Sequence, residues 1–174
     1  MPNRNPSLKS LMPGVIMIFT LLVAFTGDAF SQNSATATAN ASAVIVTPLQ
    51  ISNTAAMLFG QVAAGTAAGT VVLETTGNRS VTGGTKLGTG TGQAASFNVT
   101  GESGYTYNIT LPSSVNLTFG SNTMAVGSFT SNPSGSGTLT GGSSTLKVGA
   151  TLSVGASQAA GTYTGTFDVT VAYP

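Results

Sequence analysis

Apolar and polar residues alternate with a period of two in most segments of the chain after residue 31. The pattern is clearest in the last segment, GTYTGTFDVTVAYP, residues 161–174. One parity of this segment carries its glycines and every large apolar side chain: Gly161, Tyr163, Gly165, Phe167, Val169, Val171 and Tyr173. The other parity, up to Ala172, carries threonines and Asp168. Because successive side chains of a β-strand point to opposite faces, this pattern predicts a closing strand with one buried face.

The same period predicts further strands earlier in the chain, and no window after residue 31 shows a convincing helical period. Residues 95–100 and 105–111 are predicted to pair as a hairpin across the turn GESG, with Phe97 and Tyr105 facing inward. A change of parity between Val126 and Phe129 predicts a β-bulge near Gly127. A clean alternation then predicts a long strand whose inward side chains are Leu146, Val148, Ala150, Leu152 and Val154.

These strands are separated by turns rich in glycine, serine and threonine, a composition typical of an all-β fold. Their spacing predicts an immunoglobulin-like β-sandwich of about eight strands. We assign the sandwich to residues 47–174, as a single domain. The inward positions supply enough apolar side chains for one core without disulfide bonds.

The first residues have the pattern of a targeting signal. Arg4 and Lys9 are followed by an apolar run, residues 15–25, and then by Ala29-Phe30-Ser31, which has small residues where a signal peptidase reads. We therefore predict a signal peptide over residues 1–31, cleavage before Gln32, and export to the cell surface or beyond. An uncleaved N-terminal anchor is the alternative. Residues 32–46 form a predicted N-terminal extension ahead of the domain.

Charge and composition narrow the classes of function. After residue 31 the charged side chains are three cations and three carboxylates, and their net charge is zero: Arg79, Lys86, Lys147, Glu74, Glu102 and Asp168. A surface without a basic patch argues against nucleic acid as a partner, and against the membrane except through the signal peptide during export. The sequence has no histidine and no cysteine, so it lacks the usual general base and the commonest metal ligands. We predict no catalytic residues, no metal site and no cofactor.

Three segments, TPLQISNTAAMLFGQVAAGTAAGTVVL, SFNVTGESGYTYNITLP and GTYTGTFDVTVAYP, give the chain a family resemblance. They resemble a family of exported bacterial domains that is catalogued as a domain of unknown function, number forty-four-zero-two. The resemblance spans nearly all of the chain after the signal peptide. It implies a sandwich fold and a surface location, and it implies no established activity.

More distantly, the chain is similar to chaperone–usher pilus subunits. Their alternating C-terminal strand begins at a glycine and has an aromatic residue at the penultimate position, which Gly161 and Tyr173 match. Such subunits lack one strand of the sandwich, and a neighbour's N-terminal extension supplies it by β-augmentation. The resemblance therefore implies an assembly strand on the inward parity of residues 161–173. It also implies a donor segment, residues 35–46, with one face formed by Ala35, Ala37, Ala39, Ala41, Ala43 and Ile45.

The leading hypothesis is a non-catalytic, exported structural or adhesive protein that resembles a pilus subunit. Its partners would be other copies or other pilus subunits, together with a periplasmic chaperone and an usher. The second hypothesis is a monomeric extracellular binding module, for example for a glycan. A hydrolase ranks far behind both, because a glycosidase needs two carboxylates held across a cleft and none of the three carboxylates is placed for this.

Overall fold

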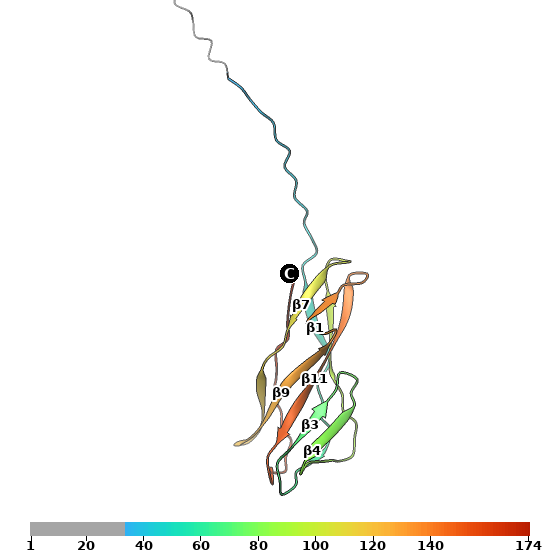
Figure 1. The fold of residues 1–174 in the computed structure, drawn as a ribbon, viewed down its shortest axis with the longest axis vertical. Helices are drawn as coiled ribbons and strands as arrows, with labels where there is room; N and C mark the ends of the chain where they lie inside the picture. Colours follow the sequence, from blue (N-terminus) through green and yellow to red (C-terminus); the bar gives the residue numbers. More distant parts are fainter. Residues whose placement is uncertain (1–33) are drawn as a thin grey trace, which may run out of the picture. The chain divides into compact units, whose positions relative to one another are not determined.

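Twelve β-strands and no helix make up the part of the chain that the computed structural model describes, residues 34–174 (Figure 1). The predicted signal peptide lies outside these residues. All strand pairs are antiparallel, which confirms the predicted all-β class. The strands are β1 Gln50–Ala55, β2 Val62–Ala63, β3 Gly69–Leu73, β4 Arg79–Gly83, β5 Lys86–Leu87, β6 Ala95–Thr100, β7 Thr106–Thr110, β8 Ser114–Phe119, β9 Asn122–Asn132, β10 Ser136–Thr138, β11 Ser143–Val154 and β12 Thr170–Ala172.

The largest sheet is organised around β11 (Figure 1). One edge of β11 pairs with β9, which in turn pairs with β8. The other edge pairs first with β6, as far as Val148, and then with β3 from Ala150 onward. β1 extends the sheet beyond β6, and β4 extends it beyond β3. A second sheet has the order β10-β7-β12, and β2 and β5 form a short separate pair.

Gly149 lies where β11 changes partner from β6 to β3. A Cβ atom at this position would lie 2.3 Å from the carbonyl oxygen of Leu73, closer than any real side chain approaches a backbone. Only glycine allows the two strands to meet end to end against β11 at this point.

The buried apolar side chains form two clusters, and β11 contributes to both. The first cluster contains Phe59, Val71, Leu73, Val126, Ala150, Leu152 and Val154. The second contains Ala95, Phe97, Val99, Tyr107, Leu139, Leu146 and Val148. Side chains of the large sheet and of the three-stranded sheet meet in the second cluster, where the hydroxyl group of buried Tyr107 donates to Ser144 Oγ at 3.0 Å.

Two of the predictions from alternation are confirmed. The predicted inward side chains of β11 are all buried. The predicted bulge is present in β9. Gly127 pairs with Thr151 and Thr130 pairs with Gly149, so β9 has one more residue than β11 between the two pairs. Ser128, inside this bulge, has a positive φ of 48°.

The predicted hairpin of residues 95–100 with residues 105–111 is wrong. β6 belongs to the large sheet and β7 to the three-stranded sheet, so the chain crosses between sheets at the GESG turn. At this crossing Gly101 approaches the Tyr173 side chain so closely that a Cβ atom would lie 2.3 Å from the Tyr173 hydroxyl oxygen. Tyr105, which was predicted to face inward, precedes β7 and is 45% exposed.

Candidate functional site

The C-terminal segment, residues 161–174, is less regular than the single long strand that its pattern predicts. Only β12 is a strand, paired with β7, and Thr164 forms an isolated bridge with Thr118 of β8. If the antiparallel register of the Thr164–Thr118 bridge continued along the segment, Thr170 would lie opposite Pro112. In the structure Thr170 lies opposite Thr110 instead. Pro112 has no backbone N–H and cannot donate to a ladder, so the register slips by two residues here.

Side-chain exposure along this segment nevertheless follows the predicted parity. The side chains on the other parity are exposed. The large apolar side chains are half-buried: Tyr163, Phe167, Val169, Val171 and Tyr173. Gly161, at the start of the segment, is exposed, and a Cβ atom there would lie 2.3 Å from the Phe119 ring. Gly161 therefore lets the Phe119 ring pack directly on the backbone.

The side of β12 that faces away from β7 is an open edge. In the three-stranded sheet β12 has the single partner β7. The N–H of Ile109 in β7 donates to Gly135 on the β10 side, so Ile109 does not exchange hydrogen bonds with Val171, which lies opposite. In an antiparallel pair the backbone groups of Val171 then point away from β7. They point toward the open edge.

The backbone of residues 165–169 continues this edge. Within the described residues, it forms no hydrogen bond with another backbone group. Phe167, at the centre of this stretch, packs against Phe129 at 5.2 Å and against Phe97 at 6.2 Å between ring centroids. The interior behind the edge is therefore already filled by large aromatic rings, while the backbone in front of it is unpaired.

The second core cluster reaches the surface in part at two edge strands. Among its half-buried members are Leu49 and Ile51, at β1, and Val169, Val171 and Tyr173, in the C-terminal segment. β1 pairs with β6 alone, just as β12 pairs with β7 alone. Some of the half-buried apolar side chains of this cluster therefore lie on the two strands that each have one free side.

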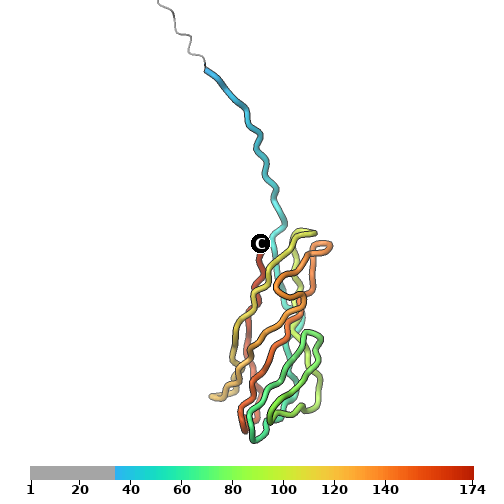
Figure 2. The backbone as a smooth tube through the Cα atoms, in the orientation of Figure 1, coloured from blue at the N-terminus to red at the C-terminus, as the bar shows by residue number. Residues whose placement is uncertain are grey.

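Thr47, which precedes β1, is bound by two residues that are distant in sequence. The Glu102 carboxylate accepts hydrogen bonds from the N–H and the hydroxyl group of Thr47, at 2.9 and 2.7 Å. The Tyr173 hydroxyl group donates to the Thr47 carbonyl oxygen at 3.0 Å and accepts from the Glu102 N–H at 2.8 Å. We call these three residues the Thr47 clamp. The clamp places the C-terminus beside the chain that enters β1 (Figure 2).

The Thr47 clamp perturbs the ionisation of Glu102. The hydrogen bond from the Thr47 N–H, and then that from its hydroxyl group, lower the pKa of the Glu102 carboxyl below its ordinary value. Both hydrogen bonds favour the charged form, and desolvation opposes them only in part. No local pattern in the sequence points to this cluster, because Glu102 is 55 positions from Thr47 and Tyr173 is 126 positions from it.

The predicted donor segment makes no strand in the described structure. Residues 34–43, taken by themselves, are exposed and irregular, and they include the alanines Ala35, Ala37, Ala39, Ala41 and Ala43. Val44 and Ile45, which precede the Thr47 clamp, are 87% and 97% exposed.

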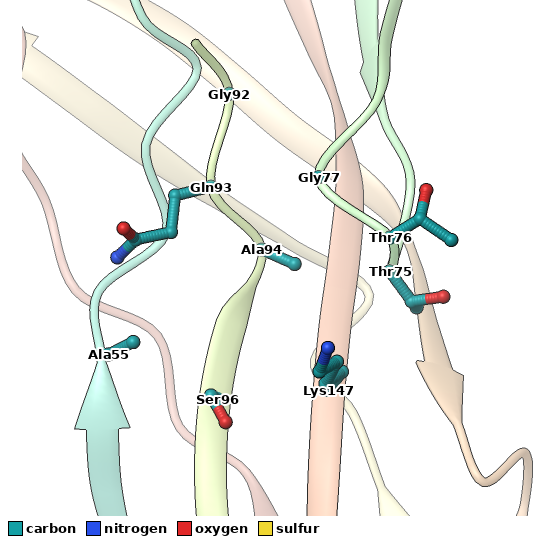
Figure 3. Close-up of a pocket in the computed structure, with 9 residues that line it drawn as sticks. All are labelled: Ala55, Thr75, Thr76, Gly77, Gly92, Gln93, Ala94, Ser96 and Lys147. Carbon is teal, nitrogen blue, oxygen red and sulfur yellow. The ribbon is translucent and has the colours of Figure 1, made fainter.

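A shallow hollow of about 260 Å³ lies over β6, β11 and the turn between β3 and β4 (Figure 3). Its one charged group is Lys147. The hydroxyl groups of Thr75 and Thr76 point away from Lys147 in Figure 3, and Gln93 donates its amide to the Ala56 carbonyl oxygen. The polar groups therefore do not converge on one point, as they do in a typical ligand pocket.

The carboxylates are dispersed over the described residues. Glu102 belongs to the Thr47 clamp, Glu74 accepts from Thr76 and Asn78 in the turn after β3, and Asp168 is exposed. Residues 34–174 contain no group of three or more acidic, histidine or cysteine side chains that could hold a metal ion. No helix in this same range is long and apolar enough to cross a membrane.

Comparison with known proteins identifies the family. The chain belongs to the family described as Domain of unknown function (DUF4402), which matches residues 49–173. No curated protein and no solved structure matches the chain. The matched range begins just before β1 and ends at Tyr173, so it includes the open edge and excludes the predicted donor segment.

Proposed function

We propose that this DUF4402 chain is an exported, non-catalytic structural or adhesive subunit of the bacterial surface that assembles by β-strand addition. In this proposal, residues 1–31 are a signal peptide and are removed, and residues 35–46 of one copy add to the open edge of another. The observation that carries the proposal is the C-terminal segment itself. Its residues 165–169 form no backbone–backbone hydrogen bond, its strand β12 has one free edge, and its large apolar side chains are half-buried.

The proposed fold is an immunoglobulin-like β-sandwich that lacks a strand. One layer is the large sheet and the other is the three-stranded sheet, with the second core cluster between them. An added strand beside β12 would pair with backbone groups such as those of Val171. It would also cover the half-buried members of the cluster on β1 and in the C-terminal segment. Burial of such apolar surface contributes about 25 cal/mol for each Å² removed from water.

The donor segment has the chemistry that this edge requires. Residues 32–46 carry no charged side chain, so their burial would desolvate no ion. Small side chains on the inward parity suit an interior that Phe97, Phe129 and Phe167 already fill. Ile45 is the one large side chain on that parity and supplies the main apolar anchor. Backbone hydrogen bonds would provide most of the remaining affinity.

An exposed strand edge on a protein with few charged side chains and a net charge of zero is prone to uncontrolled association. We therefore propose that a periplasmic chaperone covers the edge during transit, and that an usher exchanges the chaperone for the donor segment of the next subunit. Neither enzymatic activity nor a cofactor forms part of this proposal. The three carboxylates after residue 31 are dispersed, and one of them is engaged in the Thr47 clamp.

The test compares the full secreted chain with a variant that lacks residues 32–46. We expect the full chain to form a ladder of oligomers on detergent gels without boiling, and the deletion variant to be monomeric. A synthetic peptide of residues 35–46 should bind the deletion variant and raise its denaturation midpoint, since a ligand of the folded state stabilises it. A peptide with Ile45→Asp is the matched control and should bind much more weakly.

The opposite result would refute strand addition. A full chain that stays monomeric, together with a deletion variant that is equally stable and indifferent to the peptide, would show that the open edge accepts no strand. The protein would then be a self-contained extracellular binding module. A glycan array would be the next measurement in that case.

A further inference from the structure

We infer that the Thr47–Pro48 corner, held by Glu102 and Tyr173, prevents the chain from completing its own open edge and so commits residues 35–46 to a second copy. This inference rests on the proposed function and concerns the specificity of the same edge. It names the residues that select a neighbouring molecule over the chain's own extension.

Completion of the chain's own edge would require a sharp reversal at Thr47. The hydrogen bond from the Tyr173 hydroxyl group places Thr47 at the end of the C-terminal segment. To cover Val171, Val169 and Phe167 in turn, the extension would have to run back along the segment from this point. The chain would then reverse between Val46 and Leu49 to enter β1, which begins at Gln50.

Thr47 and Pro48 are poorly suited to that reversal. The favoured two-residue hairpin turns need a positive φ at the first residue of the turn, and type I′ needs it at both. The pyrrolidine ring fixes the φ of Pro48 near −65°, and it also biases the preceding residue toward extended conformations. Thr47 is β-branched, for which a positive φ is a rare outlier. In the described residues, positive φ outside glycine occurs only at Ser128 and Ser157.

The Thr47 clamp holds this corner in place from both sides. All three polar groups of Thr47 are engaged, because its N–H and hydroxyl group donate to Glu102 and its carbonyl oxygen accepts from Tyr173. Two of these hydrogen bonds go to the same carboxylate, so Glu102 holds both the backbone and the side chain of Thr47. Reorienting Thr47 for a turn would break all three together.

The test replaces the corner with a turn that permits reversal. The double substitution Thr47→Asn with Pro48→Gly introduces Asn-Gly, the preferred sequence of a type I′ hairpin turn. In the full secreted chain, we expect this variant to lose the oligomer ladder and to become monomeric. Its Val171 amide should be protected from hydrogen exchange, and added peptide 35–46 should no longer bind.

The single substitution Thr47→Asn is the matched control. It retains Pro48 and therefore blocks the type I′ turn, so it should still form the ladder even though it alters the clamp. The deletion variant without residues 32–46 serves as the second control, because it reports whether the edge accepts a strand at all.

The outcomes separate this inference from the function on which it rests. If the deletion variant binds the peptide but the Asn-Gly variant forms the same ladder as the parent chain, the inference about the corner is wrong and strand addition stands. A parent chain that is monomeric with a protected Val171 amide also overturns the inference, because it has completed its own edge. If the deletion variant does not bind the peptide, both proposals fall.

Discussion

Truncation of Phe167 tests which side chains of the C-terminal segment face the core. The assignment of the open edge depends on this orientation. Phe167 packs between the Phe97 and Phe129 rings and is half-buried. Phe→Ala at a fully buried site costs about 3 to 5 kcal/mol, and partial exposure places Phe167 at the lower end of this range. We therefore expect Phe167→Ala to lower the free energy of unfolding by about 3 kcal/mol. Thr166→Ala, one position away on the exposed parity, should change it by less than about 0.5 kcal/mol.

The measurement is chemical denaturation in the background that lacks residues 32–46, so that oligomer formation does not contribute. Tryptophan is absent, so unfolding is followed by circular dichroism and by tyrosine fluorescence. Coincident transitions by the two probes are needed before the difference is read as a free energy. Equal destabilisation by the two substitutions, or a larger effect of Thr166→Ala, would refute the facing and the open edge together, since a shift of one residue exchanges the two faces.

Two further predictions concern the clamp and the core. The pKa of Glu102 is lower in the folded state than in the unfolded state. Ionised Glu102 therefore stabilises the fold at every pH above the ordinary pKa of a glutamate. This contribution is lost as the pH falls through the lowered pKa. Glu102→Gln should therefore flatten the decline of the denaturation midpoint as the pH falls below the ordinary pKa of a glutamate, and an unchanged decline would contradict this. Gly137→Ala should lower the free energy of unfolding by about 1 to 3 kcal/mol, because the added Cβ atom would lie 2.5 Å from the Tyr107 ring. Ser136→Ala, which is exposed, is its control, and equal urea midpoints for the two variants would refute the contact.

Alternation in the sequence predicted most of the inward-facing side chains, with Tyr105 as an exception, but it did not predict which strands pair. The inward set of β11 and the exposure pattern of the C-terminal segment follow directly from a period of two. The pairing of β6 with β7 was wrong, because a strand that crosses to another sheet has the same local alternation as one that forms a hairpin. Facing is a local property of an extended chain, whereas pairing depends on segments far away.

The Thr47 clamp was beyond sequence reasoning for a related reason. A threonine before a proline, a glutamate in a turn and a penultimate tyrosine are each unremarkable in isolation. They form a cluster only because β1, the crossing from β6 to β7 and the C-terminus meet at one end of the fold. The length of the closing strand was overestimated because the interruption comes from its partner, where Pro112 breaks the ladder.

The position of β11 near the end of the chain determines when the protein can fold. Its three partners β3, β6 and β9 all precede it, so each is synthesised before the strand that joins them exists. Leu73, for example, pairs with Ala150 of β11, so the edge of β3 that faces β11 stays unpaired until Ala150 has been synthesised. Pairings so distant in sequence form slowly, and the waiting strands are exposed to aggregation in the meantime. A nascent chain stalled before residue 143 should therefore stay unfolded and depend on other proteins to keep it soluble, whatever the stability of the finished domain.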